Sequence, residues 1–266
     1  MQEPQPHRIT IGAGATAREI AVLHRPATTD NAGPGVVWLG GYRSDMTGGK
    51  AVAVCARQGE TGGACLRFDY SGHGASGGAF RDGTISRWLE ESLAIIDRFA
   101  TGPQILVGSS MGCWIALRVV QELTRRGERE RVAGLVLIAP APDFTTELME
   151  PELTDAHRAA LAEKGYFEEP TPYGPDPNVY TRDLFEDGAR NRVLDGIIDV
   201  GAPVRIIQGM EDPDVPWRHA LRLVEHLPAS NVELTLIRDG DHRLSRPEDI
   251  ERILSAIDAI AAPTGG

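Results

Sequence analysis

The chain has 266 residues, 41% of them hydrophobic and 24% charged, which suits one large α/β domain with a buried core. Its formal net charge of −11 argues against a protein that binds nucleic acid or an anionic membrane, because such a protein needs a basic face. Its three cysteines have neither metal-ligand nor disulfide spacing, so we expect reduced thiols, no metal ion and no cofactor.

The N-terminal sequence MQEPQPHRIT is polar and lacks the apolar core of a signal peptide. No later apolar run reaches the length of a transmembrane helix. We therefore expect a cytoplasmic protein that does not span a membrane. The sequence does not indicate an oligomeric state.

Two alternating segments, residues 8–12 and 18–24, predict an antiparallel hairpin at the start of the chain. Short apolar runs then alternate with amphipathic segments. The runs predict strands at residues 35–42, 64–70, 104–110, 132–141, 203–211 and 232–240, and the amphipathic segments predict helices near residues 47–57, 85–100, 111–123, 217–227 and 247–261. This alternation indicates an α/β fold with a doubly wound, mainly parallel sheet, in which ligands bind beyond the carboxyl ends of the strands.

Residues 142–200 interrupt the alternation, because they separate two strands by more than one crossover helix needs. Between residues 143 and 199 lie five prolines, 14 acidic residues and 5 basic residues, a net charge of −9. We expect a helical cap over the carboxyl edge of the sheet, with helices near residues 155–164 and 181–192. Residues 1–141 and 201–266 would then form the core.

The sequence GSSMG, residues 108–112, is typical of a nucleophile on the turn between a strand and a helix. A serine on so sharp a turn needs a residue without a side chain two positions before it and two positions after it. Ser110 has glycine at both positions, whereas Ser109 does not. We therefore expect Ser110 to be the nucleophile.

A serine hydroxyl needs a base to take its proton, and the base needs a carboxylate to orient it. In a sheet of this kind the carboxylate and then the histidine follow the serine, each after a late strand. Of the seven histidines, only His73 and His242 directly follow a predicted strand, and only His242 comes after Ser110. The order of the chain thus predicts His242 as the base.

The strand before His242 ends in QGMEDPDVPW, which offers Glu211, Asp212 and Asp214 as the acid. We prefer Asp212. Neighbouring positions at a strand end point in opposite directions, which disfavours Glu211. Asp214 is placed to cap the following helix but stays an alternative. The two aspartates that flank His242 are expected to form a turn.

An oxyanion hole needs two backbone N–H groups aimed at the place where negative charge develops. We expect one of them to be the N–H of Met111, the residue directly after the nucleophile. Tyr42, at the end of the first long apolar run, predicts the other, because Gly40 and Gly41 let the backbone approach the substrate there.

The glycine-rich sequence FDYSGHGASGG, residues 68–78, lacks both the Walker lysine and the spacing of a dinucleotide-binding loop, so we expect no nucleotide site. His73 within it is expected to brace the site. Cys113 falls inside the helix after the nucleophile and is expected to be a buried small residue.

Taken together, GSSMG, GMEDPDVP, GDHR and FDYSGHGASGG resemble the motifs of the α/β-hydrolase fold. More narrowly, GGYRSDMTGGKA, LRFDYSGHGASGG, GPQILVGSSMG and QGMEDPDVPW resemble the branch of mitochondrial acyl-glucuronide esterases and palmitoyl-protein thioesterases and its bacterial relatives, over about residues 35–260. The resemblance implies a serine hydrolase of acyl esters or thioesters. It also implies that Ser110, Asp212 and His242 stand at the positions of that family's triad.

The chain departs from the family pattern in two places. Gly40 and Gly41 stand where Pro-Gly or His-Gly is usual, and Cys113 stands where a glycine often follows the nucleophile turn. Because no mitochondrial presequence is recognisable, the location of these relatives is not carried over.

The sequence thus predicts a hydrolase that acts on a small-molecule or acylated substrate. A C–C bond hydrolase or a cofactor-free haloperoxidase uses the same triad and remains an alternative, as does a non-catalytic ligand-binding module. The charge of the cap disfavours nucleic acids and strongly anionic acyl donors. Seven apolar residues of the cap either pack it onto the sheet or line an acyl-chain pocket: Phe144, Leu148, Met149, Leu153, Tyr166, Phe167 and Leu184.

Overall fold

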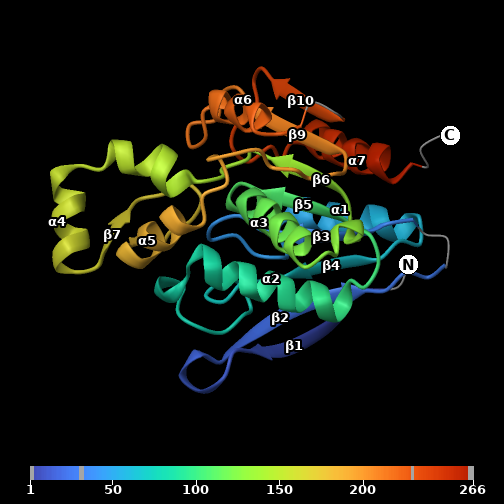
Figure 1. Cartoon of the computed structure of the whole chain (residues 1–266), viewed down its shortest axis with the longest axis horizontal. Helices are drawn as coiled ribbons and strands as arrows, with labels where there is room; N and C mark the ends of the chain where they lie inside the picture. Colours follow the sequence, from blue (N-terminus) through green and yellow to red (C-terminus); the bar gives the residue numbers. More distant parts are fainter. Residues whose placement is uncertain (1–2, 30–32, 229–230, 263–266) are drawn as a thin grey trace.

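The computed structural model, which describes residues 3–29, 33–228 and 231–262, centres on an eight-stranded sheet (Figure 1). The strands lie in the order β1 (Gln5–Ile11), β2 (Arg18–Arg25), β4 (Cys65–Phe68), β3 (Gly35–Leu39), β5 (Gln104–Ser109), β6 (Val132–Ile138), β9 (Val204–Gly209) and β10 (Val232–Ile237). The hairpin of β1 and β2 is antiparallel and joins β4 antiparallel, whereas the pairings from β4 to β10 are parallel. The predicted α/β fold with a mainly parallel sheet is confirmed.

Helices cover both faces of this sheet. Helices α2 (Ile85–Phe99), α3 (Met111–Arg125) and α6 (Trp217–Glu225) pack on one face, and α1 (Gly49–Glu60) and α7 (Pro247–Ala261) pack on the other. All five predicted helices are present. Each of the six later strands ends earlier than its apolar run predicted, because the last residues of the run belong to the loops at the carboxyl edge.

Helix α3 lies over the middle of the sheet, where β5 is flanked by β3 and β6 (Figure 1). Ten of its 15 residues are buried, among them Trp114 and Leu117 with no exposed surface. Burial on nearly every side fixes the helix relative to the sheet, and therefore fixes the turn at its N-terminus.

The insertion, residues 142–200, extends beyond the carboxyl edge of the sheet, at the left of Figure 1. It contains short helical turns at Thr145–Met149 and Glu150–Glu152, then α4 (Asp155–Glu163), β7 (Tyr166–Glu169), β8 (Asn178–Thr181) and α5 (Arg182–Arg190). The two predicted helices are present. The segment also contains an antiparallel hairpin of β7 and β8, which was not expected because its four-residue strands are too short to give a clear sequence pattern.

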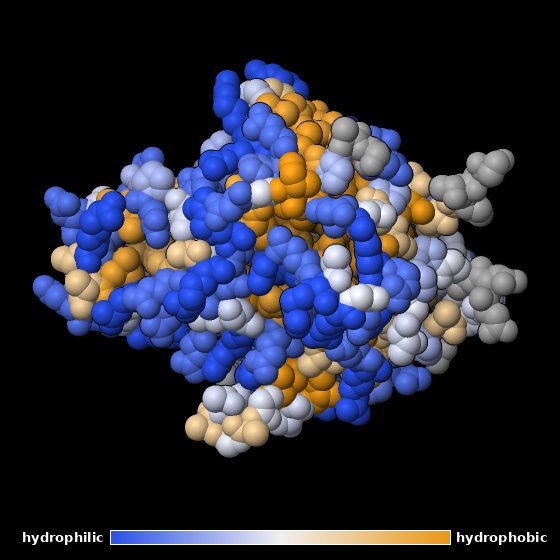
Figure 2. Space-filling model, in the orientation of Figure 1, coloured by the Kyte–Doolittle hydropathy of each residue, from blue (hydrophilic) through white to orange (hydrophobic). Residues whose placement is uncertain are grey.

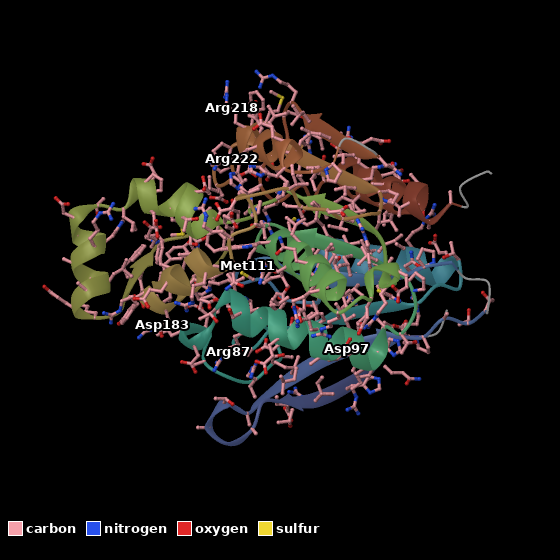
Figure 3. The ribbon with its side chains drawn as sticks, in the orientation of Figure 1. Arg87, Asp97, Met111, Asp183, Arg218 and Arg222 are labelled. Atoms are coloured by element: carbon pink, nitrogen blue, oxygen red, sulfur yellow. The ribbon has the colours of Figure 1, made fainter. Side chains whose placement is uncertain are left out.

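Both ends of the insertion are bonded to α6. Near the start, the carbonyl of Pro142 accepts a hydrogen bond from Nε2 of His219 at 2.8 Å. Near the end, the N–H of Ile198 donates to the carbonyl of His226, the residue that ends α6, at 2.7 Å. Arg222, which points from α6 toward the insertion in Figure 3, pairs with Glu147. Figure 2 shows a mostly hydrophilic outer surface over the insertion, with apolar residues visible between its segments.

Candidate active site

Ser110 lies on the turn between β5 and α3 with φ 54° and ψ −118°, a backbone conformation that residues other than glycine rarely adopt. A Cβ atom at Gly108 would come within 2.7 Å of the backbone of Cys113. A Cβ atom at Gly112 would come within 2.1 Å of the carbonyl oxygen of Leu39. Neither position has room for a side chain, which is the steric requirement that the sequence GSSMG indicates.

Three side chains from the ends of three strands meet at this turn. His242, in the loop after β10, has its Nε2 atom 3.1 Å from Oγ of Ser110. Its Nδ1 atom lies 2.8 Å from Oδ2 of Asp212, in the loop after β9. Since the carboxylate accepts from Nδ1–H, Nε2 is left with the lone pair that can accept the serine proton.

The carboxylate of Asp212 is fully buried and is held by four donors. Oδ1 accepts from the N–H groups of Asp214 and Val215, each at 2.9 Å. Oδ2 accepts from His242 and, at 3.1 Å, from Nε2 of Gln208. Gln208 on β9 was not expected from the sequence. The only signal for it is a polar residue inside the otherwise apolar end of the strand VRIIQG.

Among the described residues, neither alternative acid bonds to His242, although a carboxylate oxygen of Asp214 lies within 4.8 Å of a ring nitrogen. Glu211 is exposed to solvent, and the hydrogen bonds of its backbone N–H run to Gly240 rather than to the site. Asp214 was expected to cap α6 but does not. The residue at the N-cap position is Pro216, and no side chain accepts a hydrogen bond there. Instead Asp214 accepts a hydrogen bond from the hydroxyl of Tyr173, in the loop between β7 and β8. Burial, together with that hydrogen bond, raises the pKa of Tyr173.

The two predicted oxyanion donors, Tyr42 and Met111, both border Ser110. Met111 is the first residue of α3 and lies between the sheet and the insertion (Figure 3). A Cβ atom at Gly41 would be 3.4 Å from Cβ of Ser110, so the backbone before Tyr42 runs directly past the nucleophile. In the part of the chain that the structure describes, neither the N–H of Tyr42 nor that of Met111 has an acceptor. Both are free to bind an oxygen atom.

Two other residues singled out in the sequence lie away from the chemistry. His73 is buried among the rings of Tyr70, Phe80 and Trp88, and burial lowers its pKa to about 4. It therefore stays neutral and braces the loop of residues 68–78. Cys113 is completely buried in α3, and burial raises the pKa of its thiol.

A cavity of about 790 Å³ lies between the carboxyl edge of the sheet and the insertion. Ser110 and His242 line it. Five of the seven apolar residues of the insertion named above also line it: Phe144, Leu148, Met149, Leu153 and Phe167. Leu184 packs instead in the core, and Tyr166 lies under the guanidinium of Arg81, 3.8 Å from its ring centre. The apolar residues thus divide between packing the insertion and lining the cavity.

Charges of both signs border this cavity. The core contributes the basic residues Arg43, Lys50 and Arg243, whereas the insertion contributes acidic residues such as Glu152 and Glu169. Lys50 donates to the carbonyl of Arg243, and burial together with the charge of Arg243 lowers its pKa to about 8. The net charge of the insertion alone therefore does not set the electrostatic potential at the nucleophile.

One group of side chains in the described residues has the spacing of a metal site. Ligand atoms of Asp212, Asp214 and His242 lie within 4.8 Å of one another. However, Oδ2 of Asp212 and Nδ1 of His242 already bond to each other. The spacing follows from that hydrogen bond.

Within the described ranges, every helix is too short or too polar to cross a membrane. The sequence model of the "Alpha/beta hydrolase family" matches residues 34–253. The human protein named "Palmitoyl-protein thioesterase ABHD10, mitochondrial" is 33% identical over 227 residues, 85% of this chain and 72% of that protein.

Solved structures also show similarity to alpha/beta hydrolases. A protein from Agrobacterium vitis S4 superposes with a TM-score of 0.94 at 60% identity, covering 98% of this chain and 100% of that chain. The alpha/beta hydrolase domain-containing protein 10 from mouse superposes with a TM-score of 0.82 at 31% identity, covering 96% and 98% respectively. These similarities confirm the fold and the resemblance predicted from the sequence motifs.

Proposed function

Because this chain belongs to the alpha/beta hydrolase family, we propose that it is a serine hydrolase that cleaves acyl esters or thioesters with Ser110, His242 and Asp212. The observation that carries this proposal is the continuous hydrogen-bonded chain from Oγ of Ser110 through both ring nitrogens of His242 to Asp212. The choice of esters and thioesters is supported by the human and mouse relatives, which are named palmitoyl-protein thioesterases.

In the first half of the reaction, Oγ of Ser110 attacks the acyl carbonyl carbon while Nε2 of His242 takes the serine proton. The carbonyl electron pair moves to oxygen, and the N–H groups of Tyr42 and Met111 stabilise the oxyanion. Asp212 stabilises the imidazolium through Nδ1–H. When the tetrahedral intermediate collapses, the bond to the leaving group breaks and Nε2–H gives its proton to the departing alcohol or thiol.

In the second half, a water molecule attacks the acyl-enzyme and His242 takes its proton. The carbonyl forms again, the bond to Oγ of Ser110 breaks, and the serine recovers its proton from Nε2. The products are a carboxylic acid and the free enzyme. Neither half needs a metal ion or a cofactor.

We propose that the insertion is a cap over a core formed by residues 1–141 and 201–266. Support comes from the apolar residues with which it lines the cavity beside Ser110. An acyl chain in contact with those residues would leave water, which favours binding in proportion to the apolar area buried. The substrate would then be an acylated small molecule or an acylated protein with a chain of several carbons.

We also propose a reducing location such as the cytoplasm, although the human relative is named as mitochondrial. The proposal rests on the thiols Cys55, Cys65 and Cys113, which are all buried and free in the described chain. A reducing compartment keeps such thiols unoxidised.

The test is labelling with a fluorophosphonate, a reagent that attaches to an activated serine, followed by peptide mass spectrometry. We expect the adduct on Ser110 and none in Ser110→Ala. Matched p-nitrophenyl esters and acyl-CoA thioesters then compare the two substrate classes. An adduct on Ser109 or Cys113 would contradict the assignment, and labelling at Ser110 without turnover of any ester or thioester would favour the alternative chemistries.

A further inference from the structure

The side chain of Tyr42 is bonded to the insertion. Its hydroxyl donates to the carbonyl of Val179 on β8. Its ring stacks on that of Tyr180, with 5.5 Å between centres and 8° between planes, and meets Phe80 and Phe144 edge-on at 4.9 and 6.0 Å. Burial raises the pKa of the Tyr42 hydroxyl, so it stays a proton donor over the whole physiological pH range. The residue whose backbone N–H borders the nucleophile is therefore fixed by its side chain to β8.

The next residue repeats the connection. Arg43 has φ 57°, and its guanidinium donates to the carbonyl of Pro177, just before β8. It also lies 3.9 Å from the carboxylate of Asp176 and 5.1 Å from the ring centre of Phe80. Two consecutive residues in the loop after β3 thus contact the same short stretch of the insertion.

We propose that Tyr42 is a positioning residue, whose hydroxyl, by holding β8, aligns the backbone N–H of the same residue with the developing oxyanion. The proposal rests on the proposed function. It also means that the β7–β8 hairpin must be seated on the core before the oxyanion hole is complete. A loosened hairpin would slow the chemistry without removing any triad residue.

The local backbone explains why such an anchor is needed. Gly40 and Gly41 precede Tyr42, and glycine pairs have wide conformational freedom. The N–H of Tyr42 has no acceptor in the described chain, and its peptide unit is held only on the carbonyl side, where the oxygen of Gly41 accepts from the N–H and the hydroxyl of Ser44 at 3.1 and 2.8 Å. One rotatable bond, N–Cα, separates the N–H of Tyr42 from its Cα–Cβ bond, so a side chain tied at its far end reduces the range over which the N–H can turn. A donor in an oxyanion hole stabilises the transition state only while it is aimed at the oxygen.

The test is Tyr42→Phe, which removes the hydroxyl and keeps both the ring and the backbone N–H. We expect kcat for a p-nitrophenyl butyrate to fall about tenfold or more, a part of the 10²–10³ that loss of a whole oxyanion donor costs. The KM should stay within about twofold, because the ground-state carbonyl gains little from the donor. The matched control is Tyr166→Phe, the same change on β7 of the hairpin that Tyr42 contacts, at a residue outside the cavity, which should keep both constants.

A second readout separates positioning from general loosening of the hairpin. An alkyl trifluoromethyl ketone adds to Oγ of Ser110. The carbonyl electron pair becomes an oxyanion and His242 takes the proton, whereas the methyl ketone of the same length binds as a neutral carbonyl. Tyr42→Phe should weaken binding of the trifluoromethyl ketone by the same factor by which it lowers kcat/KM. It should change the affinity for the methyl ketone by no more than about twofold. Equal weakening of both ketones, or an unchanged kcat, would overturn the proposal.

Melting temperature checks that the variant folds. If Tyr42→Phe does not accumulate as folded protein, Arg43→Met removes the parallel contact to Pro177 and leaves Tyr42 intact. Arg43→Met should weaken binding of the trifluoromethyl ketone, by a smaller factor than Tyr42→Phe, and leave binding of the methyl ketone nearly unchanged. Equal weakening of both ketones would overturn the proposal. Failure of the proposed function itself is recognised separately, because wild-type Ser110 would then not react with a fluorophosphonate.

Discussion

Gln208 donates a hydrogen bond from its side-chain amide to Oδ2 of Asp212, the same oxygen that accepts from His242. The amide also donates to the carbonyls of Gly209 and Val215, so its position is fixed from two sides. A buried glutamine therefore sets the direction of the carboxylate that in turn orients the imidazole.

Gln208→Met tests this relationship with a side chain of similar size. A hydrogen bond to a charged group contributes about 1.5–3 kcal/mol, so we expect kcat to fall by about tenfold or more. The control is Gln104→Met, since Gln104 is also buried but lies at the opposite end of β5. Steady-state kinetics and melting temperatures of both variants give the comparison. An equal effect of the two changes on kcat would mean that Gln208 is only a packing residue.

Ser110→Ala should lower kcat by roughly 10⁶ while the protein stays folded, the loss seen when a triad nucleophile is removed. Ser109→Ala is the matched control one residue earlier, and it should keep most of the activity. Both are measured with p-nitrophenyl butyrate after active-site titration of the wild type. Similar losses in the two variants would remove the case for Ser110 as the sole nucleophile.

Asp212→Asn should lower kcat by about 10⁴, because the amide no longer holds His242 in the tautomer that leaves Nε2 free to accept a proton. Asp214→Asn removes a carboxylate that, among the described residues, accepts only from Tyr173, and it should be much milder. Kinetics and circular dichroism of the two variants decide between the two acids. Our assignment is wrong if Asp214→Asn proves the more damaging to kcat in a folded protein.

The length of the acyl chain should control kcat/KM. Each methylene that leaves water for the apolar side of the cavity contributes up to about 0.8 kcal/mol, close to fourfold in binding. We therefore expect kcat/KM for neutral p-nitrophenyl esters to rise from acetate over several carbons and then level off. Leu153→Trp, which fills part of the cavity, should shift the plateau to shorter chains. A flat or falling series in the wild type would mean that the insertion forms no acyl site.

Lys50 should make folding stability depend on pH. Burial lowers its pKa from 10.5 to about 8, so between these values the unfolded chain holds a proton that the folded chain has lost. Below about pH 8 the folded protein carries the full unfavourable free energy of burying the charged amine. As the pH rises the amine loses its proton and this destabilisation disappears. Measured by urea unfolding, the stability of the wild type relative to Lys50→Met should increase by up to about 3 kcal/mol between about pH 7 and about pH 10.5. A constant difference would contradict the shift.

The sequence predicts best what depends on local sterics and chain order. The glycines that flank Ser110 are required by contacts within the turn, so the pattern alone indicates the strand, the turn and the helix. Asp212 and His242 could be named because loops after successive parallel strands meet at one edge of the sheet. The same logic does not reach Gln208, which forms part of no motif and depends on how a strand end is packed.

Other features depend on contacts between distant parts of the chain. Tyr42 meets Val179 across 137 positions, and nothing near either residue indicates the other. The β7–β8 hairpin was missed because its strands have four residues each and a proline-rich loop separates them. The cap role expected for Asp214 was wrong because α6 begins after Pro216, without a side-chain cap.

The attachment of both ends of the insertion to α6 bears on how this protein can diversify. The proposed triad residues Ser110, Asp212 and His242 lie in loops after β5, β9 and β10, and none belongs to α6 or to the insertion. We therefore expect substitutions along α6 at positions such as His219 and Arg222 to shift the insertion, and with it the walls of the cavity, while the three proposed triad residues stay in place. We expect laboratory evolution for new acyl groups to accumulate compensating pairs of changes in α6 and residues 142–200. Substrate range would then change without substitutions at Ser110, Asp212 or His242, as long as Tyr42 keeps its hydrogen bond to Val179.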